Sequence, residues 1–339
     1  MTDDRHRNGT IQGEEAIIAL LAPLAEGHPG ALGLKDDCAL LTPPPGTELV
    51  LKTDPIAEGV HFLAGDTPED IAWKALAVNV SDIVAKGARP LGYLMALSFP
   101  RPPAHAWVSR FADGLRAAQQ TFGCHLMGGD TDRRPGPLTI SITMIGAVPT
   151  GRMIQRATAK PGDRLFVSGT IGDAALGLLL ARDPAQAANW KLSPAETEHL
   201  LARYRRPAPR LALAPVLLDH AGAAMDLSDG LVKDLDRMLR ASRTSGHLDA
   251  ARVPLSEPAR RIVAASPDWL GRLVTAGDDY EVLCAIPAAK AAAFASSATA
   301  AGIPVTEIGA VEEGPTALSV TGPDGRPLAL PERMGWDHF

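Results

Sequence analysis

The chain has 339 residues, which is longer than one hydrophobic core usually organises, so two domains are expected. Of these residues 46% are hydrophobic and 21% charged, a composition typical of a globular protein. Its formal net charge of −6 argues against a general nucleic-acid or anionic-membrane binder, because such proteins need a basic face. The three cysteines form no C-x-x-C pair, so neither a disulfide framework nor a zinc site is indicated. The polar start and the absence of a long apolar run predict a cytoplasmic protein.

The first half of the chain alternates helical and strand-like segments. The helix predicted from residue 67 is the clearest, because Thr67 can cap it, Pro68 suits its first position and Gly87 follows its end. A short buried strand is predicted over 48–56. The other predicted elements are helices over 14–27 and 102–123 and strands over 91–99, 124–133 and 137–148.

Residues 149–163 lack periodicity and contain two prolines and two glycines, so the domain boundary is predicted there. The pattern then restarts, and a two-domain α/β (or α+β) fold is expected, with domains over 1–149 and 150–339. The second half is predicted to contain strands over 164–172 and 279–287, a strand–turn–helix over 223–236, and hairpin elements over 308–313 and 318–330.

Aspartates recur at the ends of the predicted elements. They are Asp36, Asp37, Asp54, Asp82, Asp130, Asp226 and Asp229. For each aspartate taken alone, a role in a turn or helix cap is at least as consistent with the sequence as a role in metal binding. Asp82 is the exception, because it lies late in a helix, where the helix dipole disfavours an anion. Converging carboxylates repel one another, and Mg²⁺, which favours carboxylates, water and phosphate oxygens, would relieve that repulsion.

Other chemistries have little support. The chain contains neither a G-x-x-x-x-G-K-[ST] loop nor a G-x-S-x-G elbow, which argues against P-loop kinases and serine hydrolases of that type. The glycines of "SGTIGDAALG" do not match G-x-G-x-x-G, so a tight strand-to-helix turn is the simpler interpretation. From the residues alone, His61 and His125 are interpreted as structural histidines.

A family resemblance runs along nearly the whole chain. It is carried, in order, by "DDCALL", "KTDPIAEGVHF", "KALAVNVSDIVAKGARP", "GGDTDR", "PGDRLFVSGTIGDAALG", "MDLSDGL", "AGDDYEVL" and "GWDHF". These motifs closely resemble the thiamine-monophosphate kinases, which belong to the superfamily of aminoimidazole-ribonucleotide synthetase and selenophosphate synthetase. "VNVSDIVAKGARP" and "LSDGL" mark the superfamily, whereas "TDPIAEGVHF", "GDDYE" and "GWDHF" point to the kinase.

The resemblance implies a homodimer in which an N-terminal mixed sheet forms the interface. It implies that ATP and thiamine monophosphate give ADP and thiamine diphosphate, with several Mg²⁺ ions and with neither nucleic acid nor membrane as a partner. The domain over 1–149 would bind metal and ATP, and the domain over 150–339 would supply a substrate-contacting tail. A catalytically impaired nucleotide-binding homologue and a multi-metal phosphohydrolase stay as alternatives.

The resemblance also implies roles for individual residues. The metal ligands would be Asp37, Thr53, Asp54, Asp82, Asp130, Asp226 and Asp229. The ATP-contacting residues would be Gly129, Asp130, Arg156 and Ser228. The substrate-contacting residues would be His61, Asp278 and Trp336.

The expected chemistry needs no general base. The attacking group is a phosphate oxygen whose second pKa is about 6, so it is largely deprotonated at neutral pH. The difficulty is the repulsion between two anions, and metal-assisted transfer centred on Asp82 and Asp130 would relieve it.

Two positions depart from the family pattern. Lys52 stands where Ser or Thr usually precedes the Thr-Asp pair, and Asp278 stands where Glu is usual. A protonated lysine cannot ligate magnesium, but its ammonium can replace part of a cation's charge. Asp278 is one methylene shorter than Glu, so its substrate contact would be weaker or would run through a water molecule.

Overall fold

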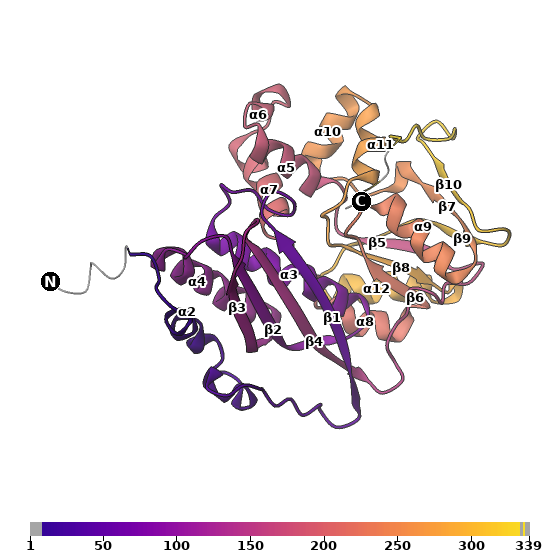
Figure 1. Ribbon diagram of the computed structural model, residues 1–339. Coiled ribbons are helices and arrows are strands. Elements are labelled where there is room, and N and C mark those ends of the chain that lie inside the picture. The colour runs from indigo at the N-terminus through magenta and orange to yellow at the C-terminus, as the bar shows by residue number, and fades with distance from the viewer. Residues whose placement is uncertain (1–8, 333–334, 336–339) are drawn as a thin grey trace. The chain divides into compact units, whose positions relative to one another are not determined.

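The protein is described by a computed structural model that places residues 9–332 and 335 (Figure 1). The described chain divides into two compact units. The first comprises the residues up to Ile83 together with Arg89–Gly151, and the second comprises Val84–Ala88 together with the residues from Arg152 onward. The expected two-domain α/β fold is confirmed.

The first unit contains a four-stranded mixed sheet in the order β1-β4-β2-β3. Strand β4 is antiparallel to both β1 and β2, and β2 is parallel to β3. The strands are β1 (Thr47–Ala57), β2 (Arg89–Phe99), β3 (His125–Arg133) and β4 (Thr139–Pro149). The helices are α2 (Glu14–Leu21), η1 (Ala22–Leu24), η2 (Pro29–Leu34), α3 (Pro68–Ala85) and α4 (His105–Phe122); the last two residues of α3 belong to the second unit.

Helix α3 begins and ends where the sequence predicts. The Thr67 hydroxyl accepts a hydrogen bond from the Asp70 amide at 3.2 Å, which satisfies one of the amides that a helix start leaves without a partner. Gly87, just past the end, has a φ of 72°, a conformation that glycine adopts without steric cost. Most α3 side chains are buried, so the helix lies inside the unit rather than on its surface.

The two faces of the first sheet differ. One face packs against helices, as shown by the ion pair between Lys52 of β1 and Asp82 of α3, 2.7 Å. The opposite face exposes Leu49, Leu51 and Leu94, which have 37%, 67% and 40% of their surface accessible. The strand predicted over 48–56 is present as β1, but the expectation that it is buried is wrong, because β1 is an edge strand with one exposed side.

The second unit contains a six-stranded mixed sheet in the order β10-β7-β9-β5-β8-β6. Its strands are β5 (Arg164–Ser168), β6 (Ala223–Asp226), β7 (Ser245–Asp249), β8 (Val282–Ile286), β9 (Val305–Glu312) and β10 (Leu318–Thr321). Its α-helices are α5 (Asp173–Arg182), α6 (Gln186–Asn189), α7 (Pro194–Arg205), α8 (Leu213–His220), α9 (Leu231–Ser242), α10 (Glu257–Ala265), α11 (Asp268–Thr275) and α12 (Ala291–Ala300). Short 3₁₀ turns are η3 (Ala250–Arg252) and η4 (Ala288–Lys290).

The core of this second unit lies between its sheet and helices α9 and α11. Leu231, Leu235 and Leu239 of α9 repeat every four residues and are fully buried against sheet residues such as Leu283. This spacing places the three leucines on one face of the helix. Because α9 is fixed in this way, the loop that precedes it is fixed as well.

The predicted hairpin elements near the C-terminus form only in part. Strand β9 pairs with β5 and β7 inside the sheet, and β10 pairs with β7 in parallel at the edge. The predicted turn is present after β10, where the Gly325 amide donates to the Gly322 carbonyl at 3.0 Å. Within the described residues, no helix is long and apolar enough to cross a membrane.

Candidate active site

The acidic residues of β1 and α3 meet around a lysine. The Nζ of Lys52 lies 2.7 Å from Oδ2 of Asp82 and 3.0 Å from Oδ2 of Asp54. Lys52 and Asp54 are two residues apart, so they project from the same face of β1, the face that meets α3. The structure therefore brings Asp54 and Asp82 together, with a positive charge between them.

This environment holds Lys52 in its charged form. Burial lowers the pKa of the ammonium, but the opposing effects of Asp82 and then Asp54 are larger in sum, so the pKa is raised above its ordinary value. At neutral pH the group is an ammonium ion. The fixed positive charge is a feature that the metal-ligand pattern alone does not predict.

Thr53 and Asp130 lie on the opposite, exposed face of the same sheet. The Thr53 hydroxyl donates to the Ile142 carbonyl at 3.1 Å, and Oδ1 of Asp130 accepts from the Thr131 amide at 2.8 Å. The strand order places β4 and β2 between β1 and β3, so Thr53 and Asp130 are about 14 Å apart across the strands and are offset by two further residues along them. One chain therefore does not bring these two predicted ligands together.

Gly129, which precedes Asp130, is required by packing. A Cβ atom at this position would lie 1.9 Å from the carbonyl oxygen of Met95 on the neighbouring strand β2. No other residue fits without separating β2 from β3 at this point. The glycine thus explains how the Asp130 end of β3 stays paired.

The other predicted residues of the first unit lie in loops. Asp37 is exposed, and the neighbouring Asp36 accepts from the Cys38 amide at 3.4 Å, which is a turn contact. His61 is half-buried, and its Nδ1 accepts from the Ala57 amide at 3.0 Å. That bond fixes the ring against the end of β1, and the role of His61 toward substrate stays a prediction.

In the second unit, the loop between β6 and α9 is organised by a buried carboxylate. Oδ2 of Asp234 accepts from the amides of Ser228 and Asp229 at 3.1 and 2.9 Å. Arg237 contacts the carboxylate of Asp229 and lies 2.9 Å from Oδ1 of Asp234. Asp226, at the end of β6, is buried.

Asp234 and Arg237 were missed by the sequence reasoning. The available signal was a carboxylate in the first turn of a helix, where it can accept from loop amides. Burial, together with the neighbouring Asp229, raises the pKa of Asp234 to about 6. Asp234 and Arg237 lie one and two turns into α9, and from there they fix the "DLSDG" loop through their contacts with Ser228 and Asp229.

The "DLSDG" loop is joined to the "GDDYE" segment by backbone hydrogen bonds. The Asp278 amide donates to the Ser228 carbonyl at 2.9 Å, and the Tyr280 amide donates to the Leu227 carbonyl at 2.8 Å. Asp278 and Tyr280 have φ values of 77° and 50°, which are uncommon for residues with side chains. Ser228 and Asp278, predicted to contact ATP and substrate, are therefore adjacent.

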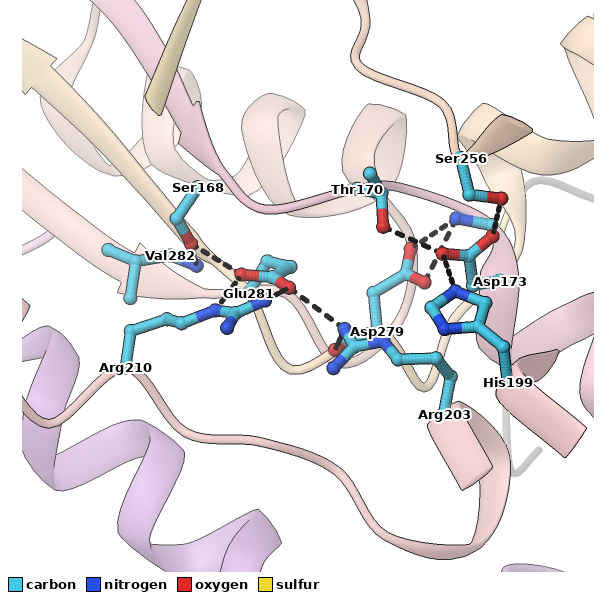
Figure 2. A network of polar contacts seen from close by, with 11 residues as sticks. Ser168, Thr170, Asp173, His199, Arg203, Arg210, Ser256, Asp279, Glu281 and Val282 are labelled. Carbon is cyan, nitrogen blue, oxygen red and sulfur yellow. Dashed lines mark hydrogen bonds and ion pairs between the residues drawn. The ribbon is translucent and has the colours of Figure 1, made fainter. Parts of the chain in front are cut away.

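A buried polar network supports this strained segment (Figure 2). Glu281 is fully buried, and its Oε1 lies 2.8 Å from Nη2 of Arg203. Its Oε2 accepts from Nε of Arg210 at 2.7 Å and from the Ser168 hydroxyl at 2.6 Å. The Ser168 oxygen accepts in turn from the Val282 amide at 2.9 Å. Two arginines and a serine thus neutralise and fix one buried carboxylate.

Asp279 points the other way in Figure 2, toward the start of α5. Both of its carboxylate oxygens accept from the Gly172 amide, at 2.9 and 3.0 Å. Complete burial raises the pKa of Asp279, although the Gly172 bond and Arg203 act in the opposite direction. The "GDDYE" segment is therefore anchored on two sides, by Asp279 at the start of α5 and by Glu281 at the two arginines and Ser168.

The network continues through Asp173, the first residue of α5. This buried carboxylate accepts from Thr170 at 2.6 Å and from Ser256 at 2.5 Å, and it lies 3.2 Å from Nε2 of His199. Burial raises the pKa of Asp173, but the bonds from His199, Ser256 and Thr170 outweigh it, so the pKa is lowered. The bond to Asp173 raises the pKa of His199.

Arg156 and Trp336 complete the set of predicted site residues. Arg156 is exposed, and its carbonyl accepts from the Ser242 hydroxyl at 3.2 Å. Trp336 lies outside the described residues. Their predicted roles toward ATP and substrate stay predictions.

The fit to magnesium is partial. Carboxylate oxygens are the ligands that Mg²⁺ prefers, and Asp54 and Asp82 converge on one point. That point is held by the ammonium of Lys52, and Asp229 is paired with Arg237. Across residues 9–332 and 335, no group of three or more His, Cys, Asp or Glu side chains is arranged to hold a metal ion.

Comparison with known proteins defines the class and then the family. Residues 35–148 match the family "AIR synthase related protein, N-terminal domain", and residues 160–320 match its C-terminal domain. The thiamine-monophosphate kinase of Caulobacter vibrioides is 42% identical over 95% of this chain and 89% of its own length. The chain belongs to the thiamine-monophosphate kinase family, and it is an enzyme of the kinase class.

Solved structures agree with this assignment. The thiamine-monophosphate kinase of Stenotrophomonas maltophilia superposes with a TM-score of 0.81 at 36% identity, covering 95% of this chain and all of that one. AaThiL, solved in complex with AMPPCP and TMP, superposes with a TM-score of 0.74 at 32% identity, covering 90% of this chain and 91% of that one.

Proposed function

We propose that the protein transfers the terminal phosphoryl group of ATP directly to thiamine monophosphate, giving thiamine diphosphate and ADP. Membership of the family supports this reaction, and so does the binding of AMPPCP and TMP by AaThiL. The observation that carries the proposal is the junction of the "DLSDG" and "GDDYE" loops, where Ser228 and Asp278 are adjacent. In this proposal, ATP held at Ser228 and thiamine monophosphate held at Asp278 would meet at this junction.

The chain's own residues position the reactants and offset charge. No side chain needs to remove a proton, because the attacking phosphate oxygen is already largely ionised. Two unit charges about 4 Å apart repel by roughly 4 kcal/mol at an effective dielectric near 20. Cations at this distance offset that repulsion and hold the in-line geometry.

The family resemblance implies that the ligands of Mg²⁺ would be Asp37, Thr53, Asp54, Asp82, Asp130, Asp226 and Asp229. At Asp54 and Asp82 the ion competes with the ammonium of Lys52, which contacts both carboxylates. When bound, the ion supplies positive charge that screens the phosphates from one another. Ser228, Gly129, Asp130 and Arg156 would hold ATP. His61, Asp278 and Trp336 would hold thiamine monophosphate, with the indole of Trp336 stacked on the cationic thiazolium.

We further propose that the working form is a homodimer built on the first sheet. Thr53 and Asp130 are about 14 Å apart across the strands, whereas two ligands of one Mg²⁺ ion are within roughly 4 Å. A second copy placed on the same face would bring its own Asp130 toward Thr53. The exposed Leu49, Leu51 and Leu94 on that face support burial against another protein surface.

The proposal is tested by a product assay. The purified enzyme is incubated with ATP, Mg²⁺ and thiamine monophosphate, with unphosphorylated thiamine as a control acceptor, and thiamine diphosphate is measured by chromatography. Formation of thiamine diphosphate only from the monophosphate is expected. Phosphate release without an acceptor would indicate the phosphohydrolase alternative, and ATP binding without any product would indicate an impaired homologue.

The role of Asp130 is tested with Asp130→Asn, which keeps the shape of the side chain and removes its charge. Thiamine diphosphate formation is expected to fall by at least about 100-fold, because a preorganised charge in a phosphoryl-transfer site is worth several kcal/mol. Asp132→Asn, two residues along the same strand, is the matched control. Equal activity of the two variants would contradict the role given to Asp130.

A further inference from the structure

The position between Asp54 and Asp82 is occupied by a cation that belongs to the chain. The ammonium of Lys52 lies within hydrogen-bond distance of both carboxylates. The side chains of Lys52, Asp54 and Asp82 retain 31%, 40% and 23% of their accessible surface. The three side chains are therefore partly shielded from water, and charges interact more strongly in such a place than at a fully exposed surface.

The surroundings of this pair are strongly negative. Asp82 lies in the last turn of α3, where the helix dipole adds partial negative charge. Asp54 lies across from it on β1, and its amide is fixed by Asn79, so it cannot move away without breaking that bond. Two facing carboxylates at a helix C-terminus require a cation, and the chain offers one at position 52.

An ammonium and a divalent ion cannot share this point. A Mg²⁺ ion bound by both carboxylates would lie 2.0–2.1 Å from each oxygen, roughly where the Lys52 nitrogen now donates. The two cations repel each other as well as compete for the same oxygens. Occupation by Lys52 therefore lowers the affinity of this pair for metal.

We propose that Lys52 takes the place of one divalent cation at the Asp54–Asp82 pair. The enzyme then binds one metal ion fewer per chain than it would with a neutral residue at position 52. This inference rests on the proposed function, since it concerns the same site. If so, the carboxylates of Asp54 and Asp82 stay partly neutralised by Lys52 when the concentration of free Mg²⁺ is low.

The test is a metal count that requires no catalysis. Bound Mn²⁺ per chain is measured by equilibrium dialysis and electron paramagnetic resonance on wild type and Lys52→Ser, with and without AMPPCP. One additional Mn²⁺ is expected for Lys52→Ser, with an affinity at least about tenfold above that of any corresponding weak site in wild type. Thermal unfolding is expected to show stronger stabilisation of Lys52→Ser than of wild type by Mn²⁺.

Two further variants separate charge from structure. Lys52→Arg keeps the positive charge and is expected to bind the wild-type number of ions. Lys160→Met removes an exposed lysine of the second unit and is expected to bind the wild-type number as well. An unchanged count in Lys52→Ser, or an extra ion in Lys52→Arg, would overturn the proposal.

The count also separates this inference from the proposed function. Dialysis without thiamine monophosphate reports on the Asp54–Asp82 pair even if no thiamine diphosphate is ever formed. Conversely, an enzyme that makes thiamine diphosphate and shows identical counts in wild type and Lys52→Ser keeps its proposed function and loses the role of Lys52.

Discussion

Replacing Arg210 by Met is expected to destabilise the second unit substantially. Arg210 donates to both carboxylate oxygens of Glu281, which is fully buried. Removing one partner of a buried ion pair costs about 3–5 kcal/mol, because the remaining charge stays out of water without compensation. Arg203 and Ser168 still contact Glu281, and Arg210 is 21% exposed, so a loss of about 2–3 kcal/mol is expected.

The size of the effect sets the assay. In a domain of 150–250 residues, each kcal/mol shifts the midpoint of thermal unfolding by about 2–4 °C. Arg210→Met is therefore expected to lower the midpoint by about 4–12 °C in calorimetry, and to lower the urea midpoint without changing the slope of the transition. Methionine keeps most of the aliphatic volume of arginine, so little of the loss comes from packing.

A matched exposed pair provides the control. Arg240 lies 2.6 Å from Asp236 one turn earlier on α9, with side chains 72% and 33% exposed. Because exposed pairs contribute about 0–1 kcal/mol, Arg240→Met is expected to lower the midpoint by only a few degrees at most. If the two variants unfold at the same temperature, the assignment of a structural role to the Glu281 network is wrong.

Three smaller predictions follow from local geometry. The bond to Asp173 raises the pKa of His199, so this bond stabilises the folded state fully below about pH 6.5, and the stabilisation is lost as the pH rises through the raised pKa. In His199→Gln, the free energy of unfolding measured with urea should therefore depend less on pH in that range. A pH dependence equal to that of wild type would contradict this. Gly129→Ala should sharply reduce folded protein, because its Cβ meets the Met95 carbonyl, and a wild-type melting temperature would refute that clash. Thr67→Ala should cost about 1 kcal/mol through loss of the helix cap, whereas Thr67→Ser should restore it.

The local elements were predictable where the responsible residues are neighbours in sequence. Helix α3 follows from Thr67, Pro68 and Gly87, all of which act within one or two turns. Strand pairing was not predictable in the same way. Strand β10 pairs with β7, which lies about 70 residues earlier, and nothing in either segment specifies its partner.

The motifs predicted which residues belong to the candidate site, but the residue types alone did not predict the contacts between them. The adjacency of Ser228 and Asp278 depends on backbone hydrogen bonds between segments about 50 residues apart, and the motif letters do not show those bonds. The contacts of Lys52 with two carboxylates likewise depend on how β1 meets α3. Residue identity indicated a departure at position 52, and only the geometry shows what the lysine does there.

The "GDDYE" segment shows why neighbouring acidic residues need separate interpretation. Asp279 and Glu281 are buried and have their hydrogen-bond partners inside the second unit, so their side chains have a structural role. Asp278, between Ser228 and this scaffold, is half-buried and has a left-handed backbone. The cost of that backbone, about 1–3 kcal/mol, is offset by the bonds of its two acidic neighbours. The segment therefore uses buried acidic side chains to present one partly exposed carboxylate, that of Asp278.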